Sequence, residues 1–106
     1  MRFKDFEIRP TIRLDGYKPI DCYDVVKWYK TAEPVEVVSL TTGDKRMEDT
    51  FCFSIAQIWY NEKEPCWEFK SVGTRFLENC EKGLCEYILK FIEMVDIEKR
   101  LEEDGL

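Results

Sequence analysis

Two stretches of the chain resemble each other, and they decide the fold that the sequence predicts. Residues 22–38 read CYDVVKWYKTAEPVEVV, and residues 52–69 read CFSIAQIWYNEKEPCWEF. With one inserted residue in the second stretch, a cysteine, a Trp-Tyr pair and a Glu-Pro pair coincide. Aromatic and β-branched residues, which pack well on a pleated sheet, dominate both stretches, and proline suits a turn that does not need its missing N–H. We therefore predict two similar β-hairpins, at residues 22–41 and 51–72, with strands at 22–29, 35–41, 51–60 and 66–72.

The first stretch also fits a helix. Asp21 can cap a helix in which Cys22, Val25, Val26 and Tyr29 form an apolar stripe. Strands are favoured because β-branched and aromatic residues dominate the stretch and the second copy has no such cap. Between the two hairpins, residues 41–50 are polar and are expected to form an exposed loop.

The segment before the hairpins alternates as a half-buried strand does. From residue 6 to residue 14 the even positions are apolar and most odd positions are charged. Pro10 cannot donate a ladder hydrogen bond, so this N-terminal strand, at residues 5–14, is expected at a sheet edge or broken there. Asp15 and Gly16 then supply a turn.

The C-terminal region, residues 75–102, has a helical period. Thr74 can cap its start, and Gly83 is expected to kink or interrupt it. Five apolar residues fall within a narrow arc that can cover one face of a sheet: Leu84, Ile88, Phe91, Ile92 and Val95. The sequence thus predicts one α+β domain over residues 1–106, an antiparallel sheet of four to five strands built from two similar hairpins and covered on one face by a C-terminal amphipathic helix.

A second apolar stripe on the same helix suggests an interface. Tyr87, Met94 and Leu101 recur at seven-residue intervals, with Ile97 nearby. A single globular helix needs one buried face, so these four residues are a candidate surface for another protein or for a second copy of the chain, as in a homodimer. The other candidates are the hairpin aromatics, of which some are expected to be exposed: Trp28, Tyr29, Trp59, Tyr60 and Trp67.

Composition narrows the classes of function. The 106 residues are 44% apolar and 36% charged, with a formal net charge of −6. An acidic chain attracts phosphate backbones poorly, which makes nucleic acid an unfavourable partner. No apolar segment approaches the roughly 20 residues that cross a bilayer, and the charged N-terminal region does not fit an export signal. With an odd number of cysteines, five, these features predict a cytoplasmic protein with reduced thiols.

The motifs of catalysis and ligand binding are missing. The chain has no histidine, no CxxC pair and only five scattered glycines, so we predict no catalytic, cofactor or metal site. Cys80 and Cys85 are five residues apart, which would put them on different sides of a helix.

The sequence therefore favours a small noncatalytic interaction or regulatory module. Three alternatives stay open: an inhibitor whose acidic helix mimics nucleic acid, a single-strand nucleic-acid binder that uses the hairpin aromatics, and a small enzyme that uses carboxylates or a cysteine.

Overall fold

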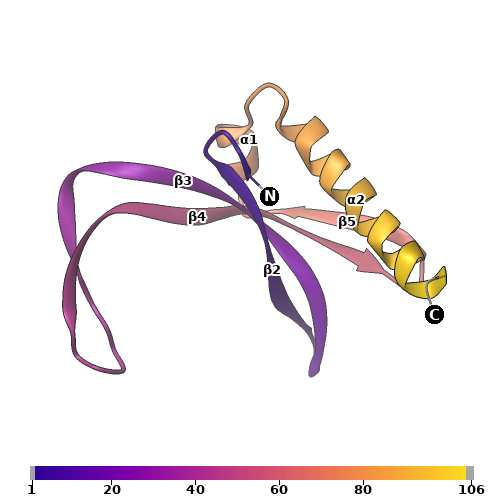
Figure 1. The fold of residues 1–106 in the computed structure, drawn as a ribbon, viewed down its shortest axis with the longest axis horizontal. Coiled ribbons are helices and arrows are strands. Elements are labelled where there is room, and N and C mark those ends of the chain that lie inside the picture. Colours follow the sequence, from indigo (N-terminus) through magenta and orange to yellow (C-terminus); the bar gives the residue numbers. More distant parts are fainter. Residues whose placement is uncertain (1, 105–106) are drawn as a thin grey trace.

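An antiparallel five-stranded sheet forms most of the computed structural model, which describes residues 2–104. The strands β1 to β5 lie in the sheet in chain order, and each pairs with the next. Their bounds, in that order, are Arg2–Phe3, Phe6–Asp15, Lys18–Val38, Lys45–Asn61 and Cys66–Ser71. Two helices follow, α1 (Arg75–Asn79) and α2 (Leu84–Asp104). The fold is α+β, as predicted, with a strongly curled sheet and a C-terminal helix (Figure 1).

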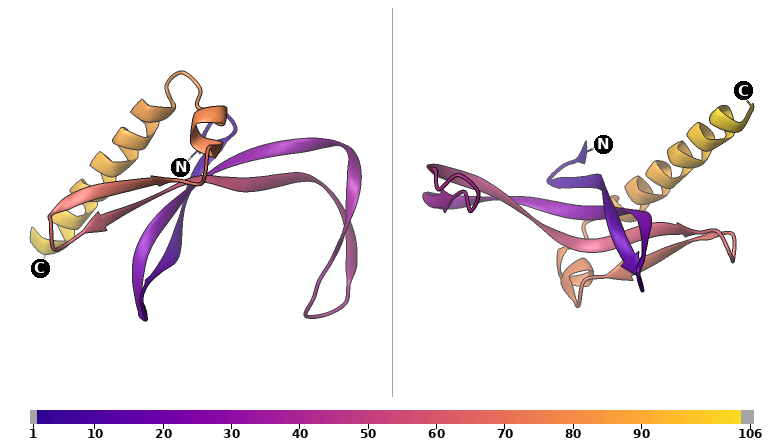
Figure 2. Two further views of the ribbon diagram at one scale, coloured as in Figure 1. Left: turned by 180° about the vertical axis from the view of Figure 1, so that it is seen from behind. Right: turned by 90° about the horizontal axis from the view of Figure 1, so that it is seen from below.

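The sheet spreads into three hairpins because the strands are paired on both sides only near its centre. Residues 18–27 of β3 pair with β2, residues 23–30 and 35–38 of β3 pair with β4, and residues 56–61 of β4 pair with β5. Within β3, only residues 23–27 have strand partners on both sides. The distal part of the β3–β4 hairpin, residues 30–50, projects as a two-stranded ribbon, which we call the arm (Figures 1 and 2).

The prediction of a hairpin at residues 22–41 was wrong. No turn follows Trp28 and Tyr29; β3 continues to Val38, and the turn comes at residues 39–44, where Ser39 N donates to Asp44 O at 2.8 Å. The predicted exposed loop at 41–50 is correspondingly shorter, since residues 45–50 belong to β4. Residues 21–30 are strand and not helix.

A large bulge explains how β3 passes through the Glu-Pro pair. Lys30 pairs with Thr50 and Val35 pairs with Glu48, so four residues of β3, 31–34, lie opposite Asp49 alone. Pro34 lies in this irregular stretch, where a missing N–H breaks no ladder bond. The equivalent Pro65 lies in the turn between β4 and β5, so the two similar stretches have different structures.

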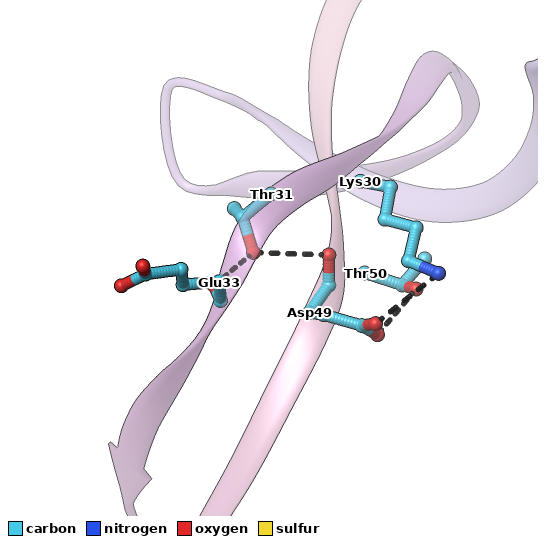
Figure 3. A network of polar contacts seen from close by, with 5 residues as sticks. All are labelled: Lys30, Thr31, Glu33, Asp49 and Thr50. Carbon is cyan, nitrogen blue, oxygen red and sulfur yellow. Dashed lines mark hydrogen bonds and ion pairs between the residues drawn. The ribbon is translucent and has the colours of Figure 1, made fainter.

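Polar contacts of the arm cluster at this bulge (Figure 3). The Thr31 hydroxyl lies 2.7 Å from Glu33 O and 3.3 Å from Asp49 O, and it can donate to one of them at a time. Lys30 Nζ lies 3.5 Å from Asp49 Oδ2, and the Thr50 hydroxyl donates to Asp49 Oδ1 at 3.1 Å. These contacts connect the bulged segment to the opposite strand.

The core lies between α2 and the centre of the sheet. Four residues of the predicted core stripe are buried there, and Ile92 packs against them: Leu84, Ile88, Phe91 and Val95. They meet buried sheet residues that include Phe6, Ile8, Val25, Ile55 and Ile58. The helical region is interrupted as expected, because α1 ends at Asn79 and α2 starts after Gly83, which has a φ of 91°.

The N-terminal strand alternates as predicted over only part of its length. Phe6 and Ile8 of β2 are buried, whereas Ile12 and Leu14 are exposed at the end of the β2–β3 hairpin. β1 pairs only with Phe6 and Glu7, so β2 has an open edge at Pro10, where the missing N–H costs no strand pairing.

Candidate functional site

The sheet opens into a fork between the β2–β3 and β4–β5 hairpins. The last β3–β4 pair on this side is Tyr23 with Ile58; beyond it, residues 18–22 of β3 pair only with β2 and residues 59–61 of β4 pair only with β5. The facing edges of the two segments have no strand partner among residues 2–104. A groove of about 690 Å³ lies between them. We call this groove, with its two open edges, the fork.

Aromatic rings line the fork. Trp59, Tyr60, Trp67 and Tyr23 all contribute to its wall. The ring centroids of Tyr60 and Trp67 are 5.7 Å apart in an edge-to-face arrangement, and those of Tyr23 and Trp67 are 6.2 Å apart. Trp67 Nε1 donates to Asp96 Oδ1 of α2 at 3.1 Å. This hydrogen bond ties β5 to the helix and holds the indole in place.

Two cations lie over these rings. The Arg13 guanidinium is 3.9 Å from the centroid of Trp59, and Lys99 Nζ is 4.6 Å from that of Tyr60 and 5.5 Å from that of Trp67. The negative face of an aromatic ring attracts a cation, and the contact holds the long side chain in a defined position. The arrangement gives the fork both apolar and positively charged contact surface.

The fork is nearly neutral although the chain is acidic. Its charged side chains are four cations and three anions: Arg13, Lys18, Lys63 and Lys99 with Asp21, Glu62 and Glu68. None of the seven forms an ion pair with another side chain that the structure describes. Glu68 accepts a hydrogen bond from Asn61 Nδ2 within the groove, and Arg13 and Lys99 lie over the rings, so a ligand that binds these three charges shares them with the contacts already present.

Three of the five predicted aromatic candidates meet in the fork, and two lie elsewhere. Trp28 is half-buried, lies 5.4 Å from the Arg2 guanidinium, and donates Nε1–H to Glu7 Oε1 at 3.4 Å. Tyr29 is 45% exposed and lies near the rings of Phe51 and Phe53 at the base of the arm.

The four residues of the predicted second stripe of α2 do not share one exposed surface. Tyr87 is buried and stacks on the ring of Phe3, with centroids 5.4 Å apart, and burial raises the pKa of its phenol. The prediction that it shares an exposed surface with the other three was wrong, because β1 folds against the start of α2. Met94, Ile97 and Leu101 are 38%, 48% and 66% exposed.

The expected separation of Cys80 and Cys85 was also wrong. Cys80 directly follows α1 and Cys85 lies in the first turn of α2, so the two residues do not share one helix, and the break at Gly83 brings the two thiols close enough to interact. Desolvation and the neighbouring Cys85 raise the pKa of the Cys80 thiol. All five cysteines are free, and only Cys22 is fully buried.

Three residues that line the fork were not predicted as candidate site residues from the sequence. Tyr23, Arg13 and Lys99 come from β3, β2 and α2, and only the folded sheet brings them beside the aromatic residues of β4 and β5. The alternation of β2 does place Arg13 on the face opposite Leu14, but no local pattern pairs it with Trp59.

Comparison with protein-family models, curated proteins and solved structures found no match to this chain. Between residues 2 and 104, neither helix is sufficiently long and apolar to cross a membrane. Nor does this part of the chain contain a group of three or more Cys, Asp and Glu side chains that could hold a metal ion.

Proposed function

We propose that the chain is a noncatalytic interaction module that binds an extended segment of another protein in the fork. The observation that carries the proposal is the pair of open strand edges, residues 18–22 and 59–61, on either side of one groove. Backbone N–H and C=O groups require hydrogen-bonding partners, which water supplies in the free chain. An added strand supplies them in a complex, while the groove accepts its side chains.

The side chains of the fork support a protein segment over a nucleic acid. The rings of Trp59, Tyr60 and Trp67 offer apolar contact to a strand whose side chains alternate between two faces. Single-stranded nucleic acid also stacks on aromatic rings, but it requires a groove with excess positive charge. Here three carboxylates line the same groove as the four cations.

The exposed flank of α2 is a weaker candidate surface. Since Tyr87 is buried, only Met94, Ile97 and Leu101 remain of the predicted stripe. Mimicry of nucleic acid by this helix is supported less than peptide binding, because Asp96 is bound to Trp67 and three exposed cations interrupt the acidic face: Lys90, Lys99 and Arg100. The fork combines a groove, open backbone edges and aromatic anchors.

A peptide selection tests the proposal. Random dodecapeptides displayed on phage are selected on the folded chain, and the enriched peptides are synthesised with a fluorescent label. We expect Trp59→Ala to weaken their binding about tenfold or more, because truncating an aromatic anchor costs about 2 kcal/mol and each step of about 1.4 kcal/mol is tenfold. Trp28→Ala is the matched control, since it removes a half-buried, Arg-covered Trp outside the fork. Circular dichroism verifies that both variants fold.

Hydrogen exchange provides a readout of the binding mode. Amides of β3 and β4 that point into the fork, within residues 20–22 and 59–61, should become protected when the peptide binds, and those of the arm should not. Binding should depend only weakly on salt.

The proposal fails if no peptide is enriched, if Trp59→Ala and Trp28→Ala bind equally, or if protection appears along α2. Tight, salt-sensitive binding of a dT12 oligonucleotide in place of peptide would identify a nucleic-acid site instead.

A further inference from the structure

The outer edge of β4 in the arm is a second open strand edge, far along the same strand from the fork. On one side residues 45–48 and 50–52 pair with β3 and Asp49 lies opposite the bulge, while on the other side β5 begins to pair only at Ala56. Among residues 2–104 no strand covers this edge. An uncovered edge is a template for pairing with another strand.

The charges on this edge are complementary to themselves in an antiparallel arrangement. Residues 45–49 read Lys-Arg-Met-Glu-Asp, with two cations before the methionine and two anions after it. If two copies pair antiparallel about a two-fold axis at Met47, each Lys45 lies opposite Asp49 of the second copy and each Arg46 opposite Glu48 of the second copy. Opposite charges that face each other across a sheet stabilise the pairing, and like charges oppose it.

The same charges exclude neighbouring registers. An axis at Arg46 would place Arg46 opposite itself and Asp44 opposite Glu48 of the second copy, and an axis at Glu48 would place Glu48 opposite itself. A parallel in-register pairing would place every charge opposite its like. Met47 is 63% exposed, so its side chain is available at the centre of such a contact. The sequence of this edge thus favours one partner, a second copy, in one register.

Contacts within the arm leave these charges available. Asp49 lies 3.5 Å from Lys30 Nζ, and Lys45 Nζ lies 3.8 Å from Glu36. Arg46 and Glu48 interact with each other along one strand. These pairs are partly exposed and hence weak, and each carboxylate can accept from a second cation.

The opposite edge of the arm is unsuitable for the same contact. It belongs to β3, where Pro34 lacks an N–H and residues 31–34 bulge out of register. The arm itself is a two-stranded ribbon, which gains stability from further strands. It projects away from α1 and α2 in all views, so a second copy can approach the β4 edge (Figures 1 and 2).

We propose that the chain forms a two-fold symmetric homodimer in which the β4 edges pair antiparallel at Met47, giving a continuous four-stranded sheet across both arms. The proposal does not depend on the function of the fork, because it uses different residues and a different partner.

Charge-reversal variants test the homodimer by sedimentation equilibrium at about 200 μM, a concentration at which a weak micromolar dimer is populated. We expect the wild-type chain to have twice its mass of 12.7 kDa. The double variant Lys45→Glu, Arg46→Glu and the double variant Glu48→Lys, Asp49→Lys should each be monomeric. Mixed together they should form a heterodimer, because all facing charges are then opposite. The variant Lys90→Glu, Arg100→Glu is the matched control and should remain dimeric, since it makes the same charge change on α2.

Three results would overturn the proposal. A monomeric wild-type chain at this concentration would exclude the dimer, a dimer that survives both charge reversals would place the contact elsewhere, and a failure of the two variants to associate on mixing would contradict the facing pairs. If either double variant loses the circular dichroism of the wild type, the single changes Arg46→Glu and Glu48→Lys replace it, with the same expected outcomes.

Discussion

Gly83 joins α1 to α2 with a φ of 91°, a conformation that other residues rarely adopt. It also lies against the ring of Phe3, so a Cβ atom at this position would be 3.1 Å from Phe3 Cζ. The absence of a side chain therefore allows both the sharp turn into α2 and the contact of β1 with the helix. That contact is the one that buries Tyr87.

Gly83→Ala should lower the free energy of unfolding by about 1–3 kcal/mol, the usual cost of a strained backbone position. Gly43→Ala is the control, since Gly43 also has a positive φ, 76°, but nothing lies near its Cβ position. Urea denaturation followed by circular dichroism should show the larger loss for Gly83→Ala. Equal losses would mean that the Phe3 contact contributes nothing.

At this scale the sequence predicts local conformations better than distant contacts. Gly83 interrupts a helical period that is visible in the sequence, and its role was expected. The burial of Tyr87 depends on Phe3, which is 84 positions away, and the position of Arg13 depends on Trp59. Such contacts arise from the pairing of strands and from the packing of α2 on the sheet, and the spacing of residues along the chain does not encode them.

Among the elements, α2 was the most predictable because its apolar period extends over several turns. Phe91, Ile88 and Val95 are buried on the predicted face. The length of β3 was not predictable, since Glu-Pro after a strand normally indicates a turn, and here it falls in a bulge within the strand. The open edges that define the fork follow from strand lengths, so the candidate site was predicted only through three of its aromatic residues.

Truncating a side chain on the buried face of α2 should lower the free energy of unfolding more than truncating one on its exposed flank. Phe91→Ala should cost about 3–5 kcal/mol of unfolding free energy, because it leaves a cavity beside Tyr23, whose ring packs edge-to-face 4.9 Å from that of Phe91. Met94→Ala, only one turn away, should cost less than about 1 kcal/mol, since its side chain is partly in solvent. Chemical denaturation measures both. A large loss for Met94→Ala in the dilute monomer would show that this flank is packed.

For the molecule as a whole, burial of thiol and phenol groups, among them Cys22, Tyr23 and Tyr87, predicts a loss of stability at high pH. Burial is the first cause that raises the pKa of both the Cys22 thiol and the Tyr87 phenol above their ordinary values of 9.0 and 10.0. The unfolded chain therefore loses these protons at a lower pH than the folded chain does. The contribution of these groups to the free energy of unfolding is fully present below about pH 9 and is lost as the pH rises through their folded-state pKa values. Each group lowers the free energy of unfolding by up to about 1.4 kcal/mol for each pH unit.

Urea titrations between pH 7 and pH 11 should show this fall, and Cys22→Ala and Tyr87→Phe should each flatten it. Tyr17→Phe is the control, because that side chain is fully exposed in the fold. A fall of the same slope in all three variants would assign the pH dependence to other groups.

One strand, β4, runs from the arm to the fork, and this continuity has a consequence for avidity. The proposed dimer contact lies at its N-terminal end and the proposed peptide groove at its C-terminal end. Two chains joined at Met47 would hold two grooves at a spacing set by paired strands, with no flexible linker between them. A ligand that carries the recognised segment twice at the matching distance would then bind its second groove as an intramolecular event, whereas a ligand with one copy would gain nothing from dimerisation.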